Sequence, residues 1–202
     1  MTSHALSFAL KGSRQYIQGP DIFNACLNLL AQQGFAEVNT VDFALHQITE
    51  TNLIATIHDT PVLELGPVLG SLKCRTSFDS IYCITLLPNT TKPEVRIPYD
   101  ESWVATHCDI DLEQRRITLN QDPALYTCIE TLVSMTKALH LGLFPGVNRQ
   151  WIFCRWVSAS WPLNARLPNL YLQLKQCLGT RLTRTEVIYQ NRHVGDIYFS
   201  TR

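Results

Sequence analysis

The chain has 202 residues, of which 46% are hydrophobic and 17% charged, so its composition excludes an intrinsically disordered protein. Its 17 basic and 17 acidic residues cancel, which removes the general electrostatic argument for a nucleic-acid or anionic-membrane partner. Residues 1–105 hold six Lys/Arg against ten Asp/Glu, and residues 106–202 hold eleven against seven. The second part is therefore the better candidate for contact with a phosphate-bearing ligand, although a solvated surface explains the same count.

The seven cysteines lie mostly inside apolar runs, and no C-x-x-C pair occurs. This usage favours buried reduced thiols over a disulfide framework. No apolar run approaches the roughly 18 residues that a membrane span needs. Residues 107–111 have metal-ligand side chains, but neighbours in an extended segment point to opposite sides, so we expect no metal there. The sequence predicts a soluble, cytoplasmic protein without metal, cofactor or membrane contact.

In chain order, residues 4–10 predict a strand and residues 11–18 a polar loop. Gly19-Pro20 then begins a helix whose apolar spacing continues to Gly34, with Pro at the first helical position. Residues 38–48 and 52–58 predict two strands, residues 60–70 an irregular loop, residues 71–87 one long strand and residues 94–98 a last short strand. A polar stretch at about 98–113 predicts the boundary between two domains, 1–105 and 106–202.

The second domain repeats this order. Residues 116–119 predict a strand, and Asp122-Pro123 predicts the cap and first position of a second helix, with Leu125 on its buried face. Residues 151–160, 169–177, 181–190 and 193–200 predict strands, with a turn at residues 191–192. Short connections between these strands predict antiparallel pairing.

The two helices also align in sequence. Residues 22–30 match residues 125–133 apolar to apolar and polar to polar, except that Leu27 stands opposite Glu130. Short strand segments match as well, at residues 41–44 with 151–154, 52–54 with 169–171, and 79–82 with 186–189. We interpret the chain as a duplicated domain whose copies differ only by loop-sized insertions.

A strand, one long apolar helix and an antiparallel sheet, present twice, resembles the hotdog-fold superfamily in its tandem "double hotdog" arrangement. The resemblance rests on element order and duplication, and it does not identify a subfamily. It implies an α+β fold with two hotdog-like units, each a sheet wrapped round its helix, related by a pseudo-two-fold axis. It also implies an acyl thioester of coenzyme A or acyl carrier protein as the ligand, and a homo-oligomer of the double unit as a possible assembly.

In such a site the helix N-terminus polarises the thioester carbonyl, and a nearby carboxylate activates water or attacks directly. Glu130 and Asp21 are the candidate catalytic acids. The alternative for Glu130 is an ordinary exposed helix glutamate. The alternative for Asp21 is a capping or first-turn residue whose charge stabilises the helix dipole. The candidate substrate-binding residues lie near the helix starts and after the second helix: Gln18, Gly19, Asn24, Asp122, Tyr126, Thr127 and Arg149. The alternative for these residues is a structural role, as a helix cap, as a side chain that hydrogen-bonds locally, or as a solvated surface residue. His140, near a helix C-terminus, predicts a favourable charge–dipole interaction.

Dehydratases of this superfamily use a histidine in the loop before the helix, and residues 11–20 and 119–123 contain none. This absence favours a thioesterase-like hydrolase over a dehydratase or hydratase. The alternative is a non-catalytic acyl-ligand-binding or assembly protein that keeps the fold without a complete active site.

Overall fold

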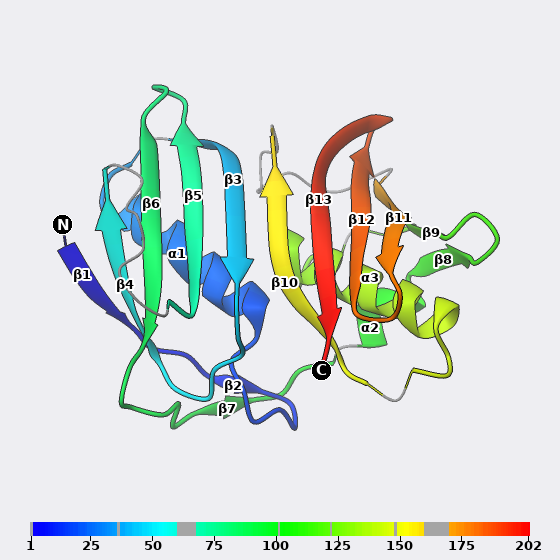
Figure 1. Ribbon diagram of the computed structural model, residues 1–202, viewed down its shortest axis with the longest axis horizontal. Coiled ribbons are helices and arrows are strands. Elements are labelled where there is room, and N and C mark those ends of the chain that lie inside the picture. The colour runs from blue at the N-terminus through cyan, green and yellow to red at the C-terminus, as the bar shows by residue number, and fades with distance from the viewer. Residues whose placement is uncertain are drawn as a thin grey trace. The chain divides into compact units, whose positions relative to one another are not determined.

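The computed structural model describes residues 2–35, 37–59, 68–100, 102–121, 123–147, 149–159 and 170–202. The chain divides into two compact units, Met1–Asp100 and Glu101–Arg202. Each has an antiparallel sheet and one long helix (Figure 1). Within the described residues, no helix is both long and apolar enough to cross a membrane.

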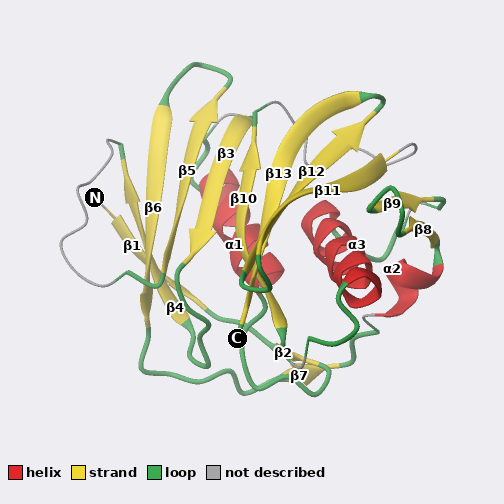
Figure 2. Ribbon diagram, turned by 45° about the vertical axis from the view of Figure 1, so that its right-hand side comes forward, coloured by secondary structure: helices red, strands yellow, loops and turns green. Residues whose placement is uncertain are grey.

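In the first unit, helix α1 follows a short strand and precedes most of the sheet. Its elements are β1 (Thr2–Leu6), β2 (Leu10–Lys11), α1 (Gly19–Gln32), β3 (Val38–Leu45), β4 (Leu53–His58), β5 (Gly70–Thr76), β6 (Ile81–Pro88) and β7 (Arg96–Ile97). The main sheet runs β1-β4-β6-β5-β3 with antiparallel neighbours. Helix α1 lies against one face of this sheet, where Phe23 meets Phe43 edge to face with ring centroids 5.3 Å apart (Figures 1 and 2).

In the second unit, α3 takes the corresponding place. The elements are α2 (Ser102–Thr106), β8 (Cys108–Asp111), β9 (Arg116–Leu119), α3 (Cys128–Leu143), β10 (Trp151–Ser158), β11 (Leu170–Leu178), β12 (Leu182–Tyr189) and β13 (Arg192–Thr201). Its sheet runs β10-β13-β12-β11-β9-β8, again with antiparallel neighbours. Alternate residues of these strands, such as Leu172, Val187 and Ile197, are fully buried and form the core beneath α3.

The two sheets differ in strand order. In the first unit the strand order is β4-β6-β5-β3. Strand β6 therefore lies between β4 and β5, and β5 borders β3. In the second unit β11, β12 and β13 follow one another in chain order, and the last of them borders β10. The expectation that the copies differ only by loop-sized insertions is therefore wrong, and the pseudo-two-fold axis stays a prediction.

Two element predictions also need correction. Residues 71–87 form two strands, β5 and β6, because the chain turns at residues 77–80 with Asp79 in a left-handed conformation (φ 63°). The helix expected from Pro123 begins at Cys128, so Leu125 lies before it and is 87% exposed. The boundary stretch at 98–113 contains α2 and β8, which the polar composition did not predict.

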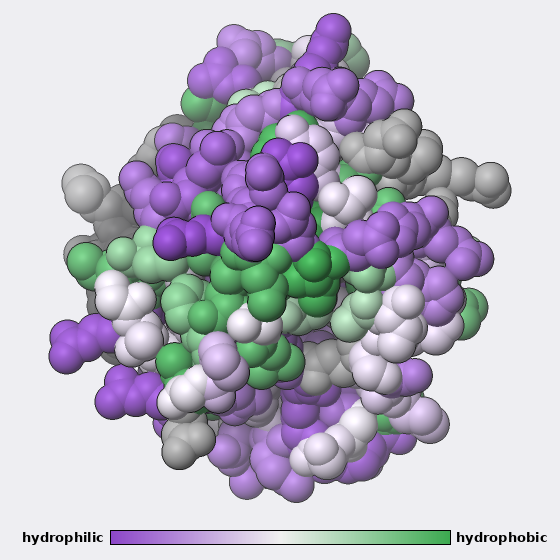
Figure 3. All heavy atoms as spheres, turned by 90° about the vertical axis from the view of Figure 1, so that its right-hand side faces the viewer, coloured by the Kyte–Doolittle hydropathy of each residue, from purple (hydrophilic) through white to green (hydrophobic). Residues whose placement is uncertain are grey.

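One face of the molecule carries both apolar and polar side chains. Figure 3 shows hydrophobic side chains gathered near the centre of this face and hydrophilic ones around them. The larger exposed apolar residues of the second unit include Ile110, Leu112, Leu125 and Leu141. The predicted homo-oligomer is not tested by this observation.

The seven cysteines are all free, but five of them are not buried, so the prediction of buried thiols is wrong for those five. Cys26 on α1 and Cys74 on β5 are the buried cysteines, and Cys177 is exposed. Burial raises the pKa of the Cys26 thiol to about 12, so this thiol is protonated and inert at neutral pH.

Candidate functional site

The loop before α1 is fixed by pairing with the end of the first unit. Strand β2 pairs in parallel with β7, which places Lys11 beside Ile97. The guanidinium of Arg96 donates to the carbonyls of Gly12 and Arg14, at 2.5 and 2.8 Å. The Ile17 amide then donates to the Thr49 carbonyl at 2.9 Å. These bonds position Gln18 as the N-cap residue of α1.

Helix α1 has Gln18 as its N-cap residue. Gln18 makes no side-chain cap bond, while its carbonyl accepts from the amides of Asp21 and Ile22 at 3.0 and 3.3 Å. Gln18 is only 7% exposed, and its side-chain Nε2 has no hydrogen-bond partner among the described residues. A buried donor without a partner is rare in native proteins and calls for an explanation. A ligand oxygen at this helix end would satisfy it.

Asp21 lies in the first turn of α1 and is paired with a cation. The Lys11 ammonium is 2.5 Å from Oδ1 of Asp21, and the two side chains are 12% and 18% exposed. Lys11 also lies over the Tyr99 ring, 5.0 Å from its centroid. Lys11 was not predicted, because its contact depends on β2–β7 pairing that no local pattern indicates.

The N-terminus of α3 is closed by its own side chains. Thr127 is the N-cap residue, and its Oγ1 accepts from the Glu130 amide at 3.4 Å. The Glu130 carboxylate accepts from the amide and the hydroxyl of Thr127, both at 2.8 Å. This is a capping box, and its signal, Thr127-x-x-Glu130, is present in the sequence. Glu130 is 7% exposed, so its reading as an ordinary exposed helix residue is wrong.

The two long helices have matching positions in a different register from the predicted one. Counted from the first helical residue, Asp21 and Glu130 are both third. With this register five buried positions coincide, as Pro20 with Ile129, Ile22 with Thr131, Phe23 with Leu132, Cys26 with Met135 and Leu30 with Leu139. The alignment of Leu27 with Glu130, and the equivalence of Asn24 and Thr127 that follows from it, are therefore wrong for the helices.

The remaining predicted residues do not gather at one place. Gly19 and Asn24 belong to the first turns of α1, beside Gln18 and Asp21. Tyr126 stacks on Trp103 with centroids 5.6 Å apart, just before the cap of α3. Arg149 is exposed on the segment that follows α3. Asp122 lies outside the described residues, and its predicted capping role is taken by Thr127.

A surface cavity of about 480 Å³ occurs elsewhere in the second unit. Its lining comes from the outward positions of β9 and β11 and from the β12–β13 turn: Arg116, Thr118, Tyr171, Gln190 and Asn191. The neighbouring residues Ile117 and Leu172 are buried toward the core, so the cavity opens on the face of the sheet away from α3. None of the sequence-predicted site residues that the structure describes lines it.

In both units one long helix follows the first main strand and lies against an antiparallel sheet. That arrangement is the one on which the sequence resemblance rested. Each unit is consistent with a hotdog-like fold. The α+β class and the antiparallel sheets are confirmed with it, and neither the subfamily nor the activity follows from the fold.

No protein-family model and no curated protein matches this sequence. Solved structures of similar fold include the tesB protein of Mycobacterium avium subspecies paratuberculosis, at 11% identity and TM-score 0.49, covering 98% of this chain and 91% of that one. Another is the dehydratase domain of PpsC from Mycobacterium tuberculosis in complex with C12:1-CoA, at 11% identity and TM-score 0.47, covering 99% and 92%. A third is a Thermobifida fusca protein provisionally named a thioesterase II, at 11% identity and TM-score 0.46, covering 99% and 92%. These similarities do not separate hydrolysis from dehydration.

Proposed function

We propose that this protein binds an acyl thioester with the carbonyl oxygen at the N-terminus of α1. The observation that carries the proposal is the buried Nε2 of Gln18, which has no partner among the described residues and lies at a helix end without a side-chain cap. A buried unsatisfied donor costs about 1–3 kcal/mol, and a carbonyl oxygen there would remove that cost. The same donor and the helix dipole stabilise an oxyanion better than a neutral carbonyl.

The reaction that this arrangement supports best is thioester hydrolysis. Asp21, held by Lys11 at 2.5 Å, takes a proton from a water molecule as that water attacks the carbonyl carbon. The negative charge that develops on the carbonyl oxygen is stabilised at the start of α1. Collapse of the tetrahedral intermediate breaks the C–S bond, and the sulfur leaves with the proton that Asp21 returns. A carboxylic acid and a thiol are the products.

The first unit is favoured over the second for this role. Glu130 occupies the matching position in α3, but both of its contacts with Thr127 belong to the capping box. A ligand oxygen at α3 would have to displace bonds that already satisfy the helix end. Glu130 as the general base therefore stays a second prediction, and it requires the capping box to open.

A non-catalytic protein is the competing proposal, and a specific observation favours it. Asp21 contacts Lys11 and Glu130 contacts Thr127, so both first-turn acids are engaged in structural bonds. In that case Gln18 binds the thioester oxygen and no water is activated. Both proposals share a ligand class, an acyl thioester carried by coenzyme A or acyl carrier protein. Arg149 is a candidate contact for the phosphate of that carrier.

Thiol release from a panel of acyl-coenzyme A and acyl-phosphopantetheine thioesters tests the proposal. We expect hydrolysis by the wild type, a loss of about 10²–10³-fold in kcat for Gln18→Met, as for removal of an oxyanion donor, and a larger loss for Asp21→Asn. Glu130→Gln is the matched control, because it alters the corresponding position of the other helix. Loss of activity in Glu130→Gln alone would transfer the site to α3.

Ligand binding and enoyl formation complete the experiment. Binding of a non-hydrolysable thioether analogue without turnover of any thioester would establish the non-catalytic alternative. Dehydration of β-hydroxyacyl thioesters, detected as enoyl absorbance, would contradict hydrolysis. If Gln18→Met binds the thioether analogue as tightly as the wild type, the ligand does not contact the N-terminus of α1, and both proposals are contradicted.

A further inference from the structure

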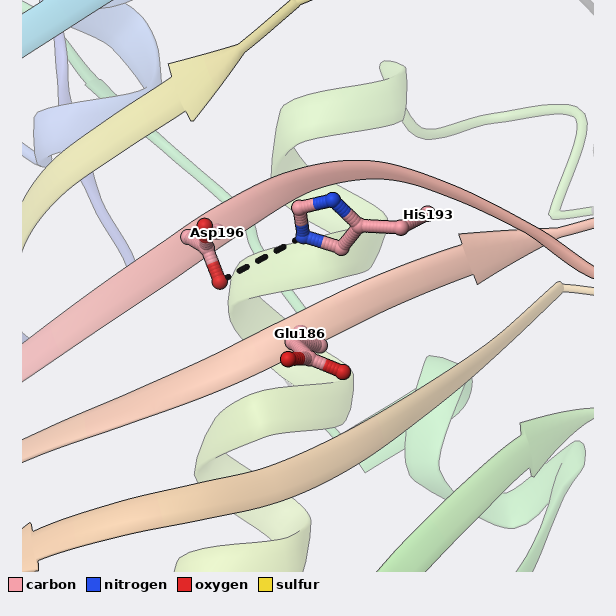
Figure 4. A group of neighbouring side chains, drawn as sticks. All are labelled: Glu186, His193 and Asp196. Carbon is pink, nitrogen blue, oxygen red and sulfur yellow. Dashed lines mark ion pairs between the residues drawn. The ribbon is translucent and has the colours of Figure 1, made fainter.

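Three metal-ligand side chains meet on the sheet of the second unit. Glu186 comes from β12, and His193 and Asp196 come from β13. One ligand atom from each lies within 4.8 Å of the others, and Nε2 of His193 is 3.5 Å from Oδ1 of Asp196. Figure 4 shows the three side chains grouped on one side of β12 and β13, with α3 behind the strands. Within the second unit, the group therefore lies on the face of the sheet away from α3.

A β-bulge creates this grouping. In a regular strand, residues three apart such as His193 and Asp196 point to opposite faces. The pairing of β13 with β12 shifts register here, since Gly195 stands opposite Val187 while His193 stands opposite Ile188. Val194 is thus the extra residue, and the bulge turns His193 to the face that carries Asp196. Bulges of this kind often re-aim a side chain next to a functional site.

The bulge depends on a glycine. A Cβ on residue 195 would lie 2.4 Å from the Val157 carbonyl oxygen and 2.5 Å from the ring of Trp156. Trp156 is fully buried beneath the sheet and cannot move aside without disturbing the core. The short segment His193-Val194-Gly195-Asp196 therefore has a defined geometry.

The two carboxylates of the cluster face each other directly. Glu186 and Asp196 are cross-strand partners, a placement in which like charges are destabilising. Oδ1 of Asp196 is shielded from solvent and has no hydrogen-bond partner among the described residues. The cations nearby give partial compensation at long distances: Lys175 is 3.4 Å from Glu186, and Arg184 is 3.5 Å from Glu186 and 3.8 Å from Asp196. A stronger positive charge between the carboxylates would remove the repulsion.

We propose that Glu186, His193 and Asp196 bind a divalent transition-metal ion, with Zn²⁺ as the best fit. One imidazole and two carboxylates suit Zn²⁺, and three protein ligands leave the fourth tetrahedral position to water. The two carboxylates neutralise the ion. The ligand atoms must draw together from the observed spacing, and the half-exposed His193 can make most of that movement. Lys175, at 44% exposure, can turn into solvent at small cost because exposed ion pairs contribute little. Arg184, at 30% exposure and with a buried Nε, would have to give up its place beside the two carboxylates.

Calorimetric titration of the intact protein with Zn²⁺ tests this site. We expect one ion per chain in the wild type, and affinity weakened by at least about 10-fold in each of His193→Ala, Glu186→Gln and Asp196→Asn. His46→Ala, at an exposed histidine of the first unit, should leave the affinity unchanged. Lys175→Ala should bind Zn²⁺ more tightly, because it removes a cation that competes for Glu186. Circular dichroism checks that each variant folds.

A thiol site is the main competing source of Zn²⁺ binding, because Cys177 is exposed. Co²⁺ in place of Zn²⁺ separates the two, since thiolate ligation gives an intense charge-transfer band that nitrogen and oxygen ligands do not. Absence of Zn²⁺ binding, affinity unchanged in His193→Ala, or loss of binding in Cys177→Ser would each overturn the proposal. Weaker Zn²⁺ binding in Lys175→Ala than in the wild type would also overturn the proposal, because it would mean that the cluster is an ion-pair network only.

Discussion

Asp21 and Glu130 occupy the same position in the two long helices, the third residue of the first turn, and each is held by a different partner. Asp21 pairs with the Lys11 ammonium from another strand, whereas Glu130 bonds to Thr127 three residues before it. The N-cap residue of α1, Gln18, makes no side-chain capping bond, whereas the local pair closes the N-terminus of α3. This difference, in residues that are matched by position, is what favours the first unit as the ligand site.

Replacing Gln18 by methionine should stabilise the free protein while weakening ligand binding. Methionine has nearly the same length, and it removes a buried donor whose missing partner costs about 1–3 kcal/mol. We expect the free energy of unfolding to rise by about 1 kcal/mol, as measured by urea denaturation without ligand. Gln15→Met, at an exposed glutamine of the same loop, is the control. A clear loss of stability in Gln18→Met would show that the amide has a structural partner.

Opening the capping box should destabilise the second unit. Thr127→Val keeps the shape of the side chain but removes the hydroxyl that accepts from the Glu130 amide and donates to the Glu130 carboxylate. We expect a loss of about 1 kcal/mol in the free energy of unfolding, within the usual range for N-cap removal. The double variant with Glu130→Gln should lose less than the sum of the two single variants, because both act on one set of bonds. Additive losses would contradict the reciprocal contact.

The buried His140 should make the protein less stable in mild acid. It is fully buried among Phe144, Trp151 and Phe199, and burial lowers the pKa of its ring to about 4. It is neutral at pH 7, so the expected charge–dipole interaction is wrong for this residue. In the unfolded chain a histidine binds its proton near pH 6.5, so protonation favours unfolding as the pH falls from about 6.5 toward 4. The full difference corresponds to about 3 kcal/mol.

His140→Leu checks this assignment through the pH dependence of unfolding. We expect stability measured between pH 7 and pH 4.5 to fall less steeply in the variant than in the wild type. His46→Ala should keep the wild-type slope because that side chain is exposed. An unchanged slope in His140→Leu would mean that other groups cause the acid sensitivity.

Adding a methyl group at the bulge should disturb the sheet of the second unit. In Gly195→Ala the new Cβ would meet the Val157 carbonyl oxygen at 2.4 Å, which only backbone movement can relieve. We expect a loss of about 1–3 kcal/mol in the free energy of unfolding, typical of overpacking. Gly146→Ala is the control, since nothing lies within 4 Å of the Cβ position there. Equal stabilities of the two variants would contradict the tight contact at the bulge.

Local sequence patterns predicted the elements whose signals are local. Helix α1 runs from Gly19 as its Gly-Pro start and apolar spacing indicated, and β9 has the predicted bounds. The strand–helix–sheet order, and with it the hotdog resemblance, came from the same kind of signal. The predicted start of α3 was wrong because it was placed at Pro123, whereas the helix begins after the Thr127-x-x-Glu130 capping box. Both signals are present in the sequence.

The sequence by itself determined the hydrophobic periodicity, the reduced cysteines and the presence of acids near both helix starts. Only the tertiary structure decided which acid pairs with Lys11, which helix end lacks a side-chain cap, and that His193 and Asp196 share a face with Glu186. The physical reason is that periodicity acts between residues three or four apart, whereas these contacts depend on strand pairing and on a one-residue bulge. Strand register is a property of the folded sheet, and a shift of one residue reverses which face every side chain occupies.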